Sequence, residues 1–110
     1  MKKLKGVFIN AEQKTLTEIE STFDEAVEKY LKDMPAIAHY IEHEEGHIDV
    51  VYGCDNGITS GKPYGFFIDE SEQDFFYGNG IVFGQCLKTG ESINSKITVI
   101  GMSKHINGFI

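Results

Sequence analysis

Glycine is distributed unevenly along this chain, and its placement limits the length of any element in the second half. Ten of the twelve glycines lie at or beyond Gly53, where they divide the apolar sequence into runs of a few residues. Glycine weakens helix and strand interiors but is favoured in tight turns. Short apolar runs between such turns are typical of antiparallel strands. The second half therefore predicts a meander of short strands, with candidates at 64–68, 80–87 and 96–102.

The first half contains one helical pattern. Thr22 and Glu25 match a capping box, in which the threonine side chain caps the helix and the glutamate stands three residues later. Apolar residues then recur at helical spacing and form one face: Phe23, Ala26, Val27, Tyr30 and Leu31. The pattern ends before Pro35, because a residue that precedes proline avoids the helical conformation. We therefore expect one long helix over about 22–33.

The helix is flanked by β-type segments. Residues 5–10 and 14–20 predict a hairpin before it, and 36–42 and 48–52 predict strands after it. With the strands of the second half, this pattern indicates an α+β protein. We expect a single small domain over 1–110, with one mostly antiparallel sheet and one long helix.

The charge of the chain excludes several classes of function. Seventeen acidic residues against ten lysines, with no arginine, give a net charge of −7. Proteins that bind DNA or long RNA normally carry a concentrated basic surface, so we expect neither partner. No apolar run approaches the roughly 20 residues of a membrane span, and we expect no secretory leader. The sequence therefore predicts a cytoplasmic protein, in which Cys54 and Cys86 are free thiols.

One segment matches a metal-binding motif. His43-Glu44-Glu45-Gly46-His47 has the H-E-x-x-H pattern, in which two histidines on one helix face bind zinc and the glutamate polarises water. Gly46 and the strand-like sequence that follows are unfavourable to such a helix. We therefore favour a solvated hairpin or loop, and expect neither a metal nor a cofactor. A zinc hydrolase that uses His43, Glu44 and His47 remains the enzymatic alternative.

Aromatic residues are concentrated in two short segments, 63–68 and 75–80, which hold six of the thirteen in the chain. Strand alternation sends one residue of each adjacent pair to the core and the other outward. An outward phenylalanine beside glycines is suited to stacking on a flat ring, and the amide of Asn79 is suited to reading a base or ribose. A phenylalanine-rich core with an Asn-Gly turn is the structural alternative.

These blocks also carry a resemblance. The segments 5–11, 48–52 and 64–69, and above all Phe75-Phe76-Tyr77-Gly78-Asn79-Gly80-Ile81-Val82-Phe83-Gly84, resemble the phage-encoded anti-Thoeris sponge family. The resemblance implies a protein that sequesters cyclic ADP-ribose isomers without cleaving them. It also implies a helical N-terminal part, an antiparallel sheet, and assembly into dimers or larger oligomers.

The resemblance further implies a ligand site. The aromatic residue and asparagine that surround the ligand in the family correspond to Phe67 (or Phe66) and Asn79. Family members use arginine for the diphosphate, and this chain has none, so Lys96 and His39 are the nearest candidates. Lysine supplies the charge but not the bidentate fork of arginine.

The main hypothesis is therefore a phage anti-defence protein that binds a cyclic nucleotide-type immune signal and catalyses no reaction. Its candidate ligand-binding residues are Phe66, Phe67, Phe76, Asn79, Lys96, His39 and Lys104. The alternative from another class is a protein–protein inhibitor of a host factor, which an acidic surface suits.

Overall fold

The fold is described from a computed structural model, which describes residues 3–32, 34–43, 46–54, 63–68 and 75–110. Within these residues, 55% lie in β-strands. The strands form a six-stranded sheet and a three-stranded sheet, all with antiparallel neighbours. None of the helices in this part of the chain is long and apolar enough to cross a membrane.

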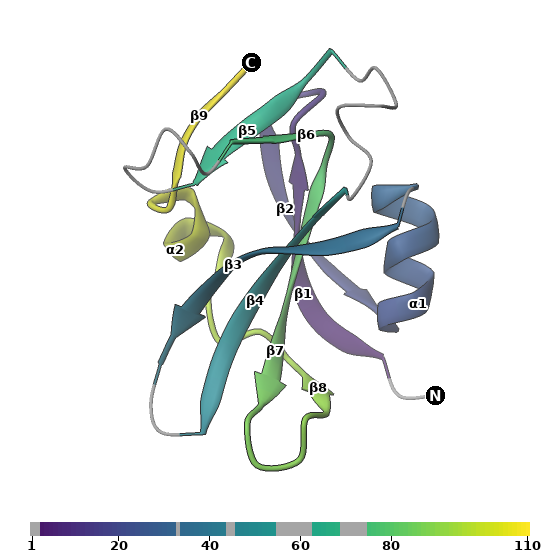
Figure 1. Ribbon diagram of the computed structural model, residues 1–110, viewed down its shortest axis with the longest axis vertical. Helices are drawn as coiled ribbons and strands as arrows, with labels where there is room; N and C mark the ends of the chain where they lie inside the picture. Colours follow the sequence, from purple (N-terminus) through teal and green to yellow (C-terminus); the bar gives the residue numbers. More distant parts are fainter. Residues whose placement is uncertain (1–2, 33, 44–45, 55–62, 69–74) are drawn as a thin grey trace.

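The six-stranded sheet has the order β2-β1-β7-β4-β3, and β8 pairs with β7 beside this path (Figure 1). Its strands are β1 (Leu4–Asn10), β2 (Thr15–Ser21), β3 (Pro35–Glu42), β4 (His47–Cys54), β7 (Gly80–Cys86) and β8 (Ser92–Ile93). Strands β1 and β8 share one edge of β7, and β4 occupies its other edge. The central position of β7 fits its sequence, because Gly80–Gly84 are all buried and apolar, as expected of a strand that is covered on both faces.

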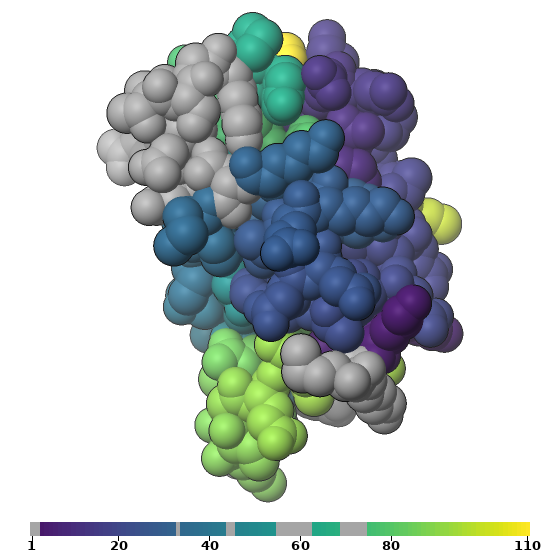
Figure 2. Space-filling model, turned by 90° about the vertical axis from the view of Figure 1, so that its right-hand side faces the viewer, coloured from purple at the N-terminus to yellow at the C-terminus, as the bar shows by residue number. Residues whose placement is uncertain are grey.

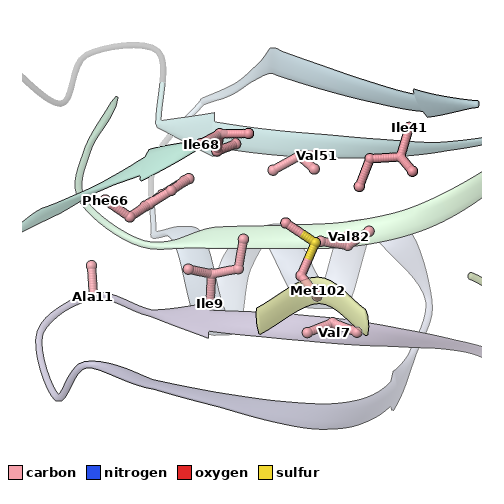
Figure 3. Packing of buried hydrophobic residues seen from close by; sticks show 9 residues of the cluster. All are labelled: Val7, Ile9, Ala11, Ile41, Val51, Phe66, Ile68, Val82 and Met102. Carbon is pink, nitrogen blue, oxygen red and sulfur yellow. The ribbon is translucent and has the colours of Figure 1, made fainter. Parts of the chain in front are cut away.

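A three-stranded sheet packs over one face of the large sheet. It has the order β6-β5-β9 and consists of β5 (Gly65–Ile68), β6 (Phe75–Tyr77) and β9 (Ile106–Phe109). A short helix, α2 (Val99–Ser103), lies beside it and contributes the fully buried Met102. Figure 3 shows Phe66 and Ile68 of β5 directed toward Val51 and Val82 of the large sheet.

The opposite face of the large sheet is covered by a helix. Along β7, Val82 belongs to the core under the small sheet, whereas Ile81 and Phe83 belong to the core under the helix. The helix contributes Ala26 and Leu31, which are both buried. Figure 2 views the molecule from the helix side, and the residues of the helix occupy the middle of that face. The large sheet is therefore the middle layer of three.

The helix begins where the sequence predicts. Thr22 is extended, and its hydroxyl accepts a hydrogen bond from the backbone N–H of Glu25 at 3.2 Å. The first turn is α-helical, α1 (Phe23–Ala26), and it continues directly as a π-helical turn, η1 (Val27–Leu31). The capping prediction is confirmed.

The predicted length of the helix is wrong, and so is the α+β class that depends on it. Only nine residues are helical instead of the expected 22–33. The N–H of Lys32 bonds to the carbonyl of Val27, five residues earlier, at 2.8 Å, and Lys32 adopts the left-handed conformation with φ 56°. The left-handed conformation of Lys32 ends the helix before Pro35, the first residue of β3, is reached. The protein is mostly antiparallel β.

Two further expectations are corrected. The strands form two sheets instead of one. The strand expected at 96–102 is absent, because Lys96 and Ile97 direct their N–H groups to a carboxylate and Thr98 caps α2. The other predicted strands at 5–10, 14–20, 36–42, 48–52, 64–68 and 80–87 are confirmed to within two residues.

The conformation of Lys32 gives a test of the helix end. We expect Lys32→Gly to stabilise the protein by about 0.5 kcal/mol, because glycine removes the steric cost of the left-handed region but gains entropy in the unfolded chain. Lys29→Gly, inside the helix, is the control and should destabilise it by about 1 kcal/mol. Urea unfolding followed by circular dichroism measures both. Destabilisation of both variants would show that the helix continues through Lys32.

Candidate functional site

The outer face of the small sheet carries an aromatic cluster of three partly exposed rings: Phe67, Phe75 and Tyr77. Phe67 and Phe75 are opposite one another in the β5–β6 register, and their ring centroids lie 4.5 Å apart. Tyr77 follows two residues later on β6, with its centroid 4.7 Å from that of Phe75. Strand alternation places the three side chains on the same face. We refer to them as the aromatic face.

Alternation also decides which of the predicted aromatic residues are internal. Phe66 is fully buried, and Phe76 packs against the same core, with ring centroids 5.8 Å apart. Of the phenylalanines expected to contact a ligand, Phe67 is therefore on the outer face, while Phe66 and Phe76 are on the inner face. Phe75 and Tyr77 were not among the expected ligand residues, although the two-residue period of a strand places them on one face.

Gly65 explains how the cluster fits on the sheet. A Cβ atom at this position would lie 2.7 Å from Cζ of Phe75, closer than side chains pack. The ring of Phe75 therefore lies over the backbone of Gly65. Glycine permits this close approach because it has no Cβ atom.

The side-chain amide oxygen of Asn79 has a structural role. This oxygen accepts hydrogen bonds from the N–H of Ala11 at 2.8 Å and of Glu12 at 3.4 Å, and so holds the turn between β1 and β2. The backbone carbonyl of Asn79 also accepts a hydrogen bond from the Cys54 thiol at 3.6 Å. Of the side-chain atoms of Asn79, the amide nitrogen has the chemistry to donate to a ligand.

The predicted basic residues do not converge on one point. Lys96 is exposed between β8 and α2, and His39 is partly buried on β3. Lys104 is exposed just after α2, on the segment that leads into β9. Asn79 bonds to Cys54 at the end of β4, whereas the Lys96 backbone bonds to Asp49, five residues earlier. Five residues of strand span roughly 17 Å, so Lys96 and Asn79 belong to opposite ends of the large sheet.

A cavity lies beside Lys96, between β1, β2 and the segment before α2. It has a volume of about 160 Å³ and is lined by residues that include Lys5, Glu18, Lys96 and Thr98. Pockets for drug-sized ligands typically measure about 300–1,000 Å³. The volume fits a small ion or a few waters, and not a nucleotide.

The two histidines of the H-E-x-x-H motif converge on a buried carboxylate. Asp49 on β4 is 0% exposed; its Oδ2 lies 2.8 Å from Nε2 of His43, and its Oδ1 lies 3.4 Å from Nε2 of His47. Asp49 also accepts hydrogen bonds from the N–H groups of Lys96, at 3.0 and 3.1 Å, and of Ile97, at 2.7 Å. Because a carboxylate accepts, each imidazole meets it with a protonated Nε2. The sequence signal for this residue is a lone acid within the apolar run 48–52.

This geometry does not match the helical zinc site that the motif describes. His43 directly follows β3 and His47 begins β4, so the two residues lie at the end of a hairpin instead of on one helix. Glu44 lies outside the described residues. Within the described part of the chain, no group of three or more histidine, cysteine or acidic side chains could hold a metal ion. The cluster instead anchors the segment 94–97 to the large sheet.

Cys86 lies at the turn between β7 and β8, which protrudes from the body of the protein in Figure 2. A hydrogen bond from the Thr89 hydroxyl, then bonds from the N–H groups of Thr89 and Lys88, lower the pKa of the Cys86 thiol. The charge of Lys88 acts in the same direction. Cys54 is buried and makes a sulfur contact to the Leu31 carbonyl at 3.6 Å. Neither cysteine is in a disulfide, and the two thiols differ in environment.

Comparisons of the chain with protein-family models, curated proteins and solved structures found no match.

We expect Asp49→Asn to destabilise the protein by roughly 3 kcal/mol, because the amide removes the charge and turns a donor toward groups that need an acceptor. The free energy of unfolding in urea measures the effect. Glu12→Gln, at an exposed position in the β1–β2 turn, is the matched control and should change stability by less than about 0.5 kcal/mol. Equal stability of Asp49→Asn and the unmodified protein would contradict the anchoring role.

The lowered pKa of Cys86 predicts how its alkylation depends on pH. We expect the rate with iodoacetamide to reach half its maximum at a lower pH than it would for a thiol that lacks these hydrogen bonds, since only the thiolate reacts. Thr89→Val removes the hydroxyl that contributes most to lowering the Cys86 pKa and should raise this midpoint. Peptide mass spectrometry separates Cys86 from the buried Cys54. An unchanged midpoint in Thr89→Val would contradict the assigned cause.

Proposed function

We propose that this protein is a non-catalytic binding protein that captures a small cyclic nucleotide, such as a cyclic ADP-ribose isomer, and releases it unchanged. In this proposal it acts in the host cytoplasm during phage infection, where removal of such a signal blocks an immune response. The observation that carries the proposal is the aromatic face of Phe67, Phe75 and Tyr77.

The aromatic face has the chemistry that an adenine ring requires. Phe67 and Phe75 are opposite one another across two strands, and their ring planes are tilted by 46°, so each ring offers its own face on which a base can stack. Base–aromatic stacking contributes about 1–3 kcal/mol per base and needs no charged side chain. The Tyr77 ring is nearly perpendicular to that of Phe75, at 86°, and bounds one side of this surface.

Among the predicted lysines, Lys104 is the best placed to meet a phosphate of such a ligand. It lies two residues before β9, and β9 pairs directly with β5, where Gly108 is opposite Phe67. Lys96 is held near Asp49 by its backbone and is better suited to the small cavity. The proposal therefore assigns stacking to Phe67 and Phe75, and charge to Lys104.

A capture-and-release assay tests the proposal. The protein is incubated with cyclic ADP-ribose isomers and with cyclic di- and trinucleotides, and free ligand is measured before and after heat denaturation. A ligand that disappears and returns intact supports capture. A ligand that returns altered, or no ligand captured at all, overturns the proposal.

The residues are tested in the same assay. We expect Phe67→Ala and Phe75→Ala each to weaken capture roughly ten- to a hundredfold, the equivalent of one lost base stack. Phe67→Tyr keeps the ring and should retain capture. Ile100→Ala, which truncates a side chain 74% exposed on α2, is the control. Full capture by Phe67→Ala at an unchanged melting temperature would contradict the assignment.

Inhibition of a host protein is a second candidate function, favoured by the acidic surface of the helix. Asp24, Glu25 and Glu28 are all exposed on α1 and η1, and such a surface suits a basic partner. Replacement of the three by the corresponding amides should then abolish binding to that partner and leave nucleotide capture unchanged.

A further inference from the structure

The row of side chains that begins with Phe75 and Phe67 ends at a glycine. Phe75 of β6 is opposite Phe67 of β5, and Phe67 is in turn opposite Gly108 of β9 (Figure 1). Directly opposite residues of neighbouring antiparallel strands lie on the same face of a sheet. Gly108 is therefore on the outer face, where the aromatic row continues without a side chain.

The backbone conformation of Gly108 does not require glycine. The described glycines that have a positive φ are Gly46, Gly78 and Gly90, and Gly108 is not one of them. A β-bulge adjoins it, because Asn107 is the additional residue in the β5–β9 register. The bulge type that needs glycine, however, holds it in the left-handed region. Other residues could therefore adopt the conformation of Gly108 without strain.

Crowding does not require glycine at this position either. A Cβ atom would lie less than 3.0 Å from a neighbouring atom at four other strand glycines: Gly6, Gly65, Gly80 and Gly84. At Gly108 the nearest described atom is Cδ2 of Phe67, at 3.9 Å from the Cβ position, which is an ordinary contact distance. A strand glycine weakens its strand, and it often marks a place that a ligand approaches closely. The open space over Gly108 therefore points to a ligand.

This space suits a flat ring. Neighbouring strands lie about 4.8 Å apart, and the ring centroids of Phe75 and Phe67 lie 4.5 Å apart across β6 and β5. A ring over Gly108 would adjoin Phe67 at similar spacing, on the side opposite to Phe75. Ile110 follows two residues later, is 51% exposed, and bonds through its N–H to the carbonyl of Gly65 at 3.1 Å. Its side chain bounds the space along β9.

The charge of the same segment suits an anionic ligand. The chain carries a net charge of −7, but no acidic residue follows Glu91 in the sequence. Lys104 is exposed two residues before β9. The segment 104–110 therefore offers an open position for a base and a cation for a phosphate, which are the two parts of a nucleotide.

We propose that Gly108 is a specificity-determining residue of the nucleotide site, because it keeps open the position in which the base of the ligand stacks against Phe67. This inference rests on the proposed function, and it assigns the base, instead of the ribose or a phosphate, to the space over β9.

Substitution of Gly108 tests the assignment in the capture assay with cyclic ADP-ribose isomers and cyclic di- and trinucleotides. Gly108→Val fills the space and should weaken capture by roughly tenfold or more, the equivalent of one lost base stack. Its melting temperature should stay the same or rise, since valine is favoured over glycine in strands. Gly108→Ala, whose Cβ fits, should weaken capture less. Thr17→Val, at an exposed position of β2, is the control and should capture fully.

The outcomes separate this inference from the proposed function. Full capture by folded Gly108→Val, while Phe67→Ala has lost capture, would overturn the role of Gly108 and leave the proposed function standing. A lower melting temperature in both Gly108→Ala and Gly108→Val would show that the fold itself needs the glycine, and would also overturn the inference. If the unmodified protein captures no ligand, the proposed function and the role of Gly108 are both wrong.

Discussion

Burial of the Asp49 carboxylate removes a charge from water, which costs several kcal/mol unless hydrogen bonds replace the lost hydration. Here the replacement comes from two backbone N–H groups of the segment 94–97 and from two imidazoles. That segment leads through α2 to β9, and β9 completes the small sheet. The contact is therefore the point from which the chain beyond residue 97 is directed over the large sheet, and the core around Met102 depends on it.

Gly84 shows how closely the segment approaches. A Cβ atom at this position would lie 3.0 Å from Nε2 of His47 and still closer to the Asn94 carbonyl. Glycine on β7 thus leaves the space that the segment and the imidazole occupy. The histidines that resemble a metal motif in sequence are explained by this packing. They supply donors for a buried acid at a hairpin end, where residues four apart meet across strands instead of along a helix.

Local sequence patterns predicted the local structure well and the long-range structure poorly. The capping box of Thr22 and the alternating strands depend on neighbouring residues, and they are confirmed. The predicted helix length was wrong because the end of the helix is set by the left-handed turn at Lys32 and by the burial of Leu31 against the sheet. The strand predicted at 96–102 was wrong because the Lys96 N–H bonds to the carboxylate of Asp49, 47 residues away in sequence. No periodicity within the segment contains that information.

The candidate site was predictable to the same extent. Alternation predicted that one residue of the adjacent pair Phe66 and Phe67 is internal and the other outer, but it did not specify which, and both were candidate ligand residues; Phe66 is the internal one. It did not select Phe75 and Tyr77, since their position beside Phe67 depends on the register of β5 with β6. The basic residues were chosen by charge alone, and charge does not specify which end of a sheet a lysine occupies. Lys96 and Lys104 illustrate this, because eight residues separate them but only Lys104 adjoins the small sheet.

Two sets of exposed apolar side chains lie on different layers of the protein. The aromatic face is on the outer side of the small sheet, whereas Ile37 and Tyr40 are on the helix side of the large sheet. The register shift within β3 is the reason, because it places Ile37 opposite Tyr52 and Tyr40 opposite Val50, two residues of β4 that share one face. A ligand that stacks on the aromatic face therefore leaves the helix side of the large sheet uncovered.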